Sequence, residues 1–276
     1  RLMTEKRFSP EVIQRLFTAV EEDDRVDAQV SLPPTISLHC TAEIIQSNYA
    51  LCLQFWEEGV KRQDLLHLTL KQAAGDALST EERMQYKYMR ARFKHLRFAQ
   101  RLYLQTHQAG FLFGKTTVFL GRFQDGFRNQ KQDIITFYAR LLRVYLSAPA
   151  WALVRYCLRH SRLAGVEAFI AYRQAQMRAL KGVIAKPMLT GREFHDVRKI
   201  ISQQVSYYDT LRAIDPENSE ARQVSRFLAA INGLMGDRHD EMVADDMENR
   251  LAYATPAALD DDIRQRLELL VARFPL

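Results

Sequence analysis

Five basic residues between positions 87 and 101 recur at spacings of three and four residues. They are Lys87, Arg90, Lys94, Arg97 and Arg101. At about 100° per residue of an α-helix they fall within an arc of about 80°, so they form one stripe about four turns long, called here the basic stripe. Like charges at these spacings repel each other, and no acidic residue lies between Lys87 and Arg101. A repeating polyanion would remove this repulsion and release its own counterions, so the pattern favours a polyanion-binding surface.

The charge distribution along the chain allows a second interpretation of the stripe. The net charge is +6, but residues 86–178 contain 17 Lys and Arg against three acidic residues, a net charge of +14. The rest of the chain contains 22 basic and 30 acidic residues and carries −8. So cationic a segment attracts phosphate, anionic lipid or an acidic partner. Alternatively, the stripe is an ordinary solvated face, or its charges pair with acidic residues from elsewhere in the chain.

The elements that carry these residues are predicted to be helices. The 276 residues include only 11 Gly and 8 Pro, and few segments alternate in the manner of strands, so we predict an all-α fold. Ser79 with Glu82 and Thr190 with Glu193 form two capping boxes that each begin a long helix. Pro216 and Pro256 are expected in first helical turns. The predicted helices cover residues 10–20, 41–74 as one or two helices, 80 to beyond 101, 114–146, 150–186, 191–213, 217–252 and 257–273.

The two capped helices begin about 108 residues apart and suggest an internal repeat. In each half the next helix carries a polar segment, "DGFRNQKQD" in the first and "GDRHDEMVADD" in the second. We expect two antiparallel four-helix bundles with an extra helical N-terminal region. The predicted ranges are 1–80 for that region, 81–186 for the first bundle and 187–276 for the second. The acidic segment that ends in Pro33 and Pro34 is typical of a linker, so residues 1–35 are expected to form an arm.

The stretches "YMRARFKHLR" and "FHDVRK" resemble the helix-opening signature of the CHAD family, in which His-x-x-Arg is followed by further basic residues. The stretch "LMGDRHDEMV" is similar to the second signature of that family, a Leu-Gly turn that leads to His or Arg followed by Asp. The similarity covers about residues 86–250. It implies two facing four-helix bundles whose basic residues line a groove that binds inorganic polyphosphate.

The resemblance assigns candidate polyanion-binding residues in both halves. In the second half His195 and Arg198 match His-x-x-Arg, Lys199 extends it, and His239 matches the second signature. In the first half Lys87 stands in the place of the histidine, and Arg128 with Lys131 belongs to the polar segment. Ser202, Gln203 and Val205 stand where the family carries cations. The second half is therefore expected to hold a depleted site.

Other chemistry finds little support in the sequence. "GFLFGKTT" lacks the spacing and the preceding strand of a phosphate-binding P-loop. His239, Asp240 and Glu241 are consecutive and point in different directions on a helix, so we expect no metal site. No nucleophile or second carboxylate completes a catalytic set with His195, and we expect neither an enzyme nor a cofactor. Phe119, Phe123 and Phe127 are spaced as a core stripe rather than a base-stacking surface.

The sequence thus predicts a non-catalytic helical module that binds inorganic polyphosphate or another phosphate-rich polyanion. Two alternatives stay open. One is a helical scaffold that docks an acidic protein, and the other, less favoured, is an RNA-binding protein. Three cysteines at spacings that match no disulfide or zinc pattern, together with the absence of a transmembrane segment or signal peptide, predict a cytoplasmic location.

Overall fold

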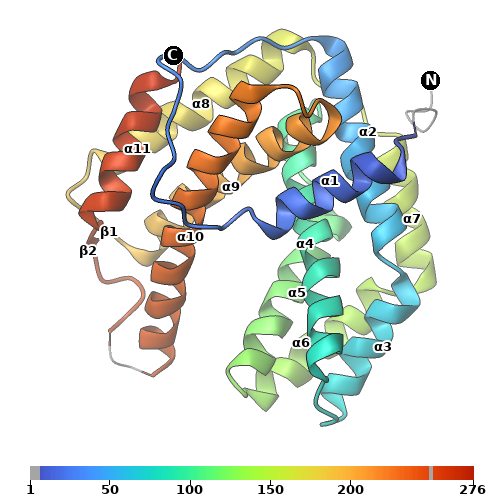
Figure 1. The fold of residues 1–276 in the computed structure, drawn as a ribbon. Helices are drawn as coiled ribbons and strands as arrows, with labels where there is room; N and C mark the ends of the chain where they lie inside the picture. Colours follow the sequence, from blue (N-terminus) through green and yellow to red (C-terminus); the bar gives the residue numbers. More distant parts are fainter. Residues whose placement is uncertain (1–6, 249–250) are drawn as a thin grey trace. The chain divides into compact units, whose positions relative to one another are not determined.

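The structure is a computed structural model that describes residues 7–248 and 251–276, and helices dominate it (Figure 1). The all-α prediction is therefore confirmed. The single sheet in the described residues pairs two short strands, β1 (Met188–Leu189) and β2 (Ala257–Ala258), in antiparallel register. The helices are α1 (Pro10–Glu21), α2 (Ala42–Gly59), α3 (Arg62–Ala73), α4 (Thr80–Tyr103), α5 (Phe111–Arg128), α6 (Gln132–Tyr145), α7 (Ala148–Arg159), α8 (Val166–Ile184), α9 (Gly191–Ile214), α10 (Ser219–Met247) and α11 (Asp261–Arg273).

The contacts of the chain divide it into two compact units. Unit 1 contains Arg7 and Phe8 together with Tyr49–Ala164, and unit 2 contains Ser9–Asn48 together with Gly165–Leu276. These units differ from the predicted ranges 1–80, 81–186 and 187–276. The reason is that α3 packs against α4 and α6 in unit 1, whereas α1 packs against α9 in unit 2. The N-terminal region is thus shared between the two units.

Local sequence signals set the starts of the long helices. Ser9 caps α1, whose first residue is Pro10, as predicted. Both capping boxes are present: in α4 the Ser79 side chain accepts from the Glu82 N–H while the Glu82 side chain accepts from the Ser79 N–H, and Thr190 and Glu193 do the same in α9. These contacts confirm the predicted starts of the two helices.

Four predicted boundaries are wrong. The predicted helix 114–146 is divided into α5 and α6 at a turn in which Gln130 adopts a positive φ of 54°. The predicted helix 150–186 is divided into α7 and α8, because residues 160–165 leave the helix and Leu163 bridges to Leu104. Pro216 lies before α10, whose N-cap is Asn218, and Pro256 precedes β2 rather than a helix. Neither proline therefore lies in a first helical turn: Pro216 is in the turn before α10, and Pro256 directly precedes β2.

Unit 1 is built around an aromatic core. Trp56 of α2 is fully buried and makes edge contacts with Phe93 of α4 and Phe113 of α5 at ring centroid distances of 5.6 Å. Phe123 and Phe127 of α5 are also buried, which confirms the core assignment of that stripe for these two rings. This core fixes the rotation of α4 about its axis.

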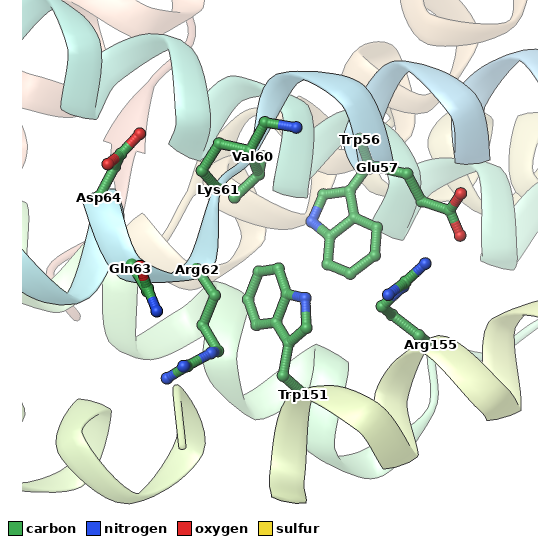
Figure 2. Close-up of a pocket in the computed structure, with 9 residues that line it drawn as sticks. All are labelled: Trp56, Glu57, Val60, Lys61, Arg62, Gln63, Asp64, Trp151 and Arg155. Atoms are coloured by element: carbon green, nitrogen blue, oxygen red, sulfur yellow. The ribbon is translucent and has the colours of Figure 1, made fainter. Parts of the chain in front are cut away.

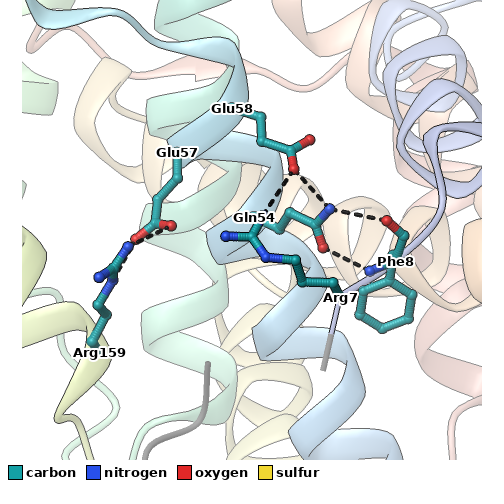
Figure 3. A network of polar contacts seen from close by, with 6 residues as sticks. All are labelled: Arg7, Phe8, Gln54, Glu57, Glu58 and Arg159. Atoms are coloured by element: carbon teal, nitrogen blue, oxygen red, sulfur yellow. Dashed lines mark hydrogen bonds and ion pairs between the residues drawn. The ribbon is translucent and has the colours of Figure 1, made fainter. Parts of the chain in front are cut away.

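The first described residues of the chain are bonded to α2 within unit 1 (Figure 3). The Phe8 N–H donates to Gln54 Oε1 at 2.8 Å, and Gln54 Nε2 donates back to the Phe8 carbonyl at 3.0 Å. Nearby, Arg159 of α7 donates two hydrogen bonds to the Glu57 carboxylate, at 2.9 and 3.1 Å. A two-bond arginine–carboxylate pair is geometrically specific, so it ties α7 to α2.

Unit 2 is built around the hairpin of α9 and α10, which lie side by side (Figure 1). Residues 22–34 do not form the predicted arm, because they pack on this unit. Asn232 of α10 donates to the Asp23 carbonyl at 3.0 Å, and Arg273 of α11 donates to the Leu32 carbonyl at 2.8 Å. Arg173 of α8 is 1% exposed and donates to Gln204 and Tyr208 of α9.

Within residues 7–248 and 251–276, no helix has the length and apolar character that crossing a bilayer requires.

Candidate functional site

The basic stripe lies along α4 on the side away from the core of unit 1. Tyr86, Met89, Phe93 and Leu96 of the same helix are buried and recur at spacings of three and four residues. Because this face is buried, the cations of the basic stripe lie on a different side of α4. Lys87 is exposed, and Arg90, Lys94, Arg97 and Arg101 are half-buried. From Lys87 to Arg101 the stripe extends about 21 Å, at 1.5 Å per helical residue.

Arg90 lies against a glycine of the next helix. A Cβ atom built on Gly121 of α5 would lie 2.9 Å from Nη2 of Arg90, closer than side-chain carbons pack. Gly121 is itself buried. The missing side chain therefore leaves the room in which the Arg90 guanidinium rests on α5.

Arg97 and Lys87 have no carboxylate partner among the described residues. The buried Nε of Arg97 also has no hydrogen-bond acceptor there. Burial, and then the neighbouring Arg101, lower the pKa of the Arg97 guanidinium to about 10. The side chain stays charged at neutral pH, and a bound anion would oppose the shift because it favours the charged form of the guanidinium.

Two other polar residues of the same stretch serve the core instead. Arg92 donates to the Phe55 carbonyl at 2.7 Å, and its guanidinium lies 4.0 Å from the centre of the Phe55 ring. His95 is 4% exposed. Burial, and then Arg92, lower the pKa of His95 to about 3, so its imidazole is neutral at neutral pH. Neither residue belongs to the basic stripe.

Arg128 and Lys131 lie at the turn between α5 and α6 rather than on α4. Arg128 is in the last turn of α5 and Lys131 is the N-cap of α6. Both side chains are exposed. The structure thus places these two candidates on a different element from the stripe.

In unit 2 the two candidate histidines come together. The rings of His195 on α9 and His239 on α10 have centroids 5.1 Å apart. His239 Nε2 is 3.0 Å from the hydroxyl of Tyr253, a residue of the segment between α10 and β2. The Gly191 N–H at the start of α9 donates to the Tyr253 carbonyl at 2.9 Å, so the same residue also holds the helix start.

Arg198 repeats the arrangement of Arg90. A Cβ atom built on Gly236 of α10 would lie 2.9 Å from Nη2 of Arg198. The buried Nε of Arg198 has no hydrogen-bond acceptor among the described residues. The resemblance treated Leu234–Gly236 as part of a turn, but these residues lie inside α10. Lys199 follows Arg198 and points about 100° away around the helix.

Two of the three α9 positions at which the resemblance implied cations are buried in unit 2. Gln203 and Val205 are 4% and 2% exposed, and Ser202 is half-buried. Gln203 accepts a hydrogen bond from the Tyr172 hydroxyl at 3.0 Å, and Ser202 donates to Asn232 at 2.9 Å. A charged side chain in place of Gln203 or Val205 would be buried almost without solvent contact, which is strongly unfavourable.

Three residues that shape these surfaces were not predicted. Arg83 precedes Lys87 by four residues, lies in the same arc of α4 and is exposed, and the spacing alone could have included it. Gly121 and Tyr253 act through contacts with residues distant in sequence, and no local pattern marks them. Gly236 belongs to the second signature, but its contact with Arg198 was not predicted.

No group of three or more His, Cys, Asp or Glu side chains in the described ranges is placed to hold a metal ion. Comparison with known proteins gives no further assignment, because no family model, no curated protein and no solved structure matches this chain.

Proposed function

We propose that the protein is a non-catalytic module that binds inorganic polyphosphate or a similar phosphate-rich polyanion. The observation that carries the proposal is the basic stripe, in which cations follow one another along about 21 Å of one helix face. Lys87 and Arg97 have no carboxylate partner among the described residues, so their charge is available to a ligand.

The electrostatics of the stripe favour a linear polyanion over a single small anion. Cations one turn apart repel each other, and a chain of phosphates supplies one negative charge after another along the same line. The partly desolvated guanidinium of Arg97 would gain most, because charge-assisted hydrogen bonds are strongest where water is excluded.

Unit 2 supports the same chemistry with a smaller set of residues. Arg198, His195 and His239 place nitrogen donors near one another on α9 and α10, and the Arg198 Nε has no acceptor among the described residues. Arginine suits phosphate because its planar fork can donate two parallel hydrogen bonds. Within the proposal, the stripe carries most of the affinity and the unit 2 set contributes less.

Salt dependence of binding tests the proposal directly. We expect the logarithm of the affinity for long-chain polyphosphate to fall linearly with the logarithm of the salt concentration, by about 0.7 for each neutralised phosphate if the ligand behaves as a single strand. Arg90→Glu and Lys94→Glu should each weaken binding and make this slope shallower. Arg143→Glu, at an exposed position of α6, is the matched control with the same charge change. It should leave the affinity and the salt dependence nearly unchanged.

The other two interpretations predict different results. A scaffold for an acidic protein would bind one protein partner in a pull-down that survives treatment with polyphosphatase and nuclease. An RNA-binding protein would release polyphosphate when RNA competes at similar phosphate concentration. Absence of polyphosphate binding, or charge reversals on α4 that have no effect, would remove the proposal.

A further inference from the structure

Unit 1 contains a pocket where α2 ends, α3 begins and α7 packs beside them (Figure 2). Its volume is about 530 Å³, within the range of sites that hold small organic ligands. Six residues matter for its chemistry, and they are Trp56, Val60, Lys61, Arg62, Trp151 and Arg155. None of them belongs to the basic stripe.

The Trp56 indole brings an unused hydrogen-bond donor to this pocket. Trp56 is 0% exposed, and its Nε1 has no acceptor among the described residues. Figure 2 shows the nitrogen edge of the ring facing the space between Lys61, Arg62 and Trp151. The ring is stacked on Trp151 at a centroid distance of 4.9 Å and held by Phe93 and Phe113. A buried donor without an acceptor is unfavourable, so an acceptor atom of a ligand would improve this site.

The pocket also adjoins the start of a helix that no side chain caps. Lys61 is the N-cap of α3 and makes no side-chain capping hydrogen bond. The free N–H groups and the dipole of a helix start attract negative charge. Trp56 Nε1 and the first turn of α3 therefore offer donors to the same kind of group, an anion.

The charged side chains at the rim favour an anion as well. The side chains of Lys61 and Arg155 have no hydrogen bond or ion pair among the described residues, and the Arg62 side chain donates to the Leu146 carbonyl at 3.1 Å. Two carboxylates lie nearby. Glu57 is neutralised by Arg159, and Asp64 points away from the two indoles (Figure 2).

We propose that this pocket binds a small organic carboxylate with a flat apolar body, of the class of aromatic acids. The carboxylate oxygens would accept from Trp56 Nε1 and from the first turn of α3, and Arg155 and Lys61 would neutralise the charge. The apolar body would lie against Trp151 and Val60, which an inorganic polyanion could not use. The site is thus separate from the polyanion surface and goes beyond the proposed function.

Tryptophan fluorescence of the full chain tests the pocket without a label. The chain contains two tryptophans, and both line this pocket. Benzoate should produce a saturable change in emission, with excitation at a wavelength that benzoate does not absorb. Benzyl alcohol and benzylamine have the same ring without the negative charge, and they should bind at least about tenfold more weakly. Phenyl phosphate distinguishes a carboxylate site from a general anion site and should bind more weakly than benzoate.

Two substitutions locate the binding, with titration calorimetry as the readout. Trp56→Phe keeps an aromatic ring and removes the N–H, and it should weaken benzoate binding about tenfold, as expected for a hydrogen bond to a charged group. Arg155→Gln, at an exposed position, should weaken it about threefold to tenfold. Arg143→Gln is the matched control on α6 and should have no effect.

Thermal melts monitored by circular dichroism establish whether each variant folds. If Trp56→Phe does not fold, the benzoate affinity of Arg155→Gln tests the proposal. The proposal is overturned if no saturable benzoate binding is seen, if benzyl alcohol or phenyl phosphate binds as tightly as benzoate, or if Arg155→Gln binds benzoate like the parent.

Discussion

The helices α4 and α9 begin alike and are used differently. Each has 24 residues and a capping box. In each the capping glutamate also pairs with a lysine before the helix, Lys71 with Glu82 at 2.8 Å and Lys186 with Glu193 at 2.5 Å. Each also carries an arginine whose guanidinium lies over a glycine of the next helix.

The two helices differ in what covers them. On α4 the cations continue from Lys87 to Arg101, and only one face of the helix is buried. On α9 every residue from Val205 to Thr210 is buried, because α1, α8 and α10 of the same unit pack around it. A similar helix start can therefore support a charged surface or a core, depending on the elements packed against the rest of the helix. The internal repeat expected from the sequence stays a prediction.

The largest expected effect is a loss of polyphosphate affinity when the charges of the basic stripe on α4 are reversed. The double substitution Lys87→Glu with Arg97→Glu should weaken polyphosphate binding about 100-fold, because two reversals of surface charge remove about 3 kcal/mol of attraction. Equilibrium titration at fixed salt concentration measures it. Reversal of Arg140 and Arg143, two exposed arginines of α6, should change the affinity much less. Equal loss in both double variants would mean that only net charge matters.

A smaller effect is expected from α9. Arg198→Glu should weaken polyphosphate binding about tenfold, since one arginine of the unit 2 set is reversed while the stripe is intact. Arg192→Glu makes the same charge change in the exposed first turn of α9, on a different face of the helix. If Arg198→Glu lowers the polyphosphate affinity no more than Arg192→Glu does, α9 takes no part in binding. The two helices then differ in function even more than we propose.

The glycine contacts test whether the two arginines are held in equivalent ways. Gly121→Ala and Gly236→Ala should each weaken polyphosphate binding about threefold, because a Cβ atom would displace the guanidinium. Stability should be unchanged or raised by up to about 1 kcal/mol, since alanine is the better helix former and the displaced group is the flexible end of a side chain. Calorimetric melts and binding titrations separate the two effects.

Matched glycine controls exist in both units. A Cβ atom on Gly114 of α5 would meet nothing closer than 3.6 Å, and one on Gly182 of α8 would meet nothing within 4 Å. Alanine at these positions should leave binding unchanged. An affinity loss as large as that of Gly121→Ala would show that the arginine contact is not the cause.

The smallest effect concerns acid stability at the two capping boxes. The hydrogen bond from Lys71, and then the Ser79 N–H, lower the pKa of Glu82 from 4.5 to about 2. Lys186, and then the Thr190 N–H, lower the pKa of Glu193 as well. A carboxyl group whose pKa is lowered by folding stabilises the folded state above its unfolded pKa, and this contribution is lost as the pH falls through the folded pKa.

The stabilising contribution of Glu82 is therefore lost as the pH falls from 4.5 to about 2. In urea titrations across this range Glu82→Gln should flatten the pH dependence of the free energy of unfolding, and Glu193→Gln should do so less. Glu81→Gln, one residue earlier in the exposed first turn of α4, is the control. A steeper dependence in Glu82→Gln would contradict the direction of the shift.

The sequence by itself determined the helical fold class, the starts of α1, α4 and α9, and the alignment of the basic stripe. These features depend on residues within a few positions of one another, such as the Ser79 hydroxyl and the Glu82 N–H. Helical periodicity likewise fixes which side chains of α4 share a face, whatever packs on the opposite side.

Only the tertiary structure decided what each face meets. Several contacts join residues from different helices, and no local spacing predicts them. Examples are the contact of His195 with His239, the packing of Arg90 on Gly121 and the burial of Gln203. The same holds for the division of the N-terminal region between the two units and for the pocket around Trp56. Packing selects these contacts because the apolar faces of several helices must be buried together, and that selection acts on the whole unit rather than on any one segment.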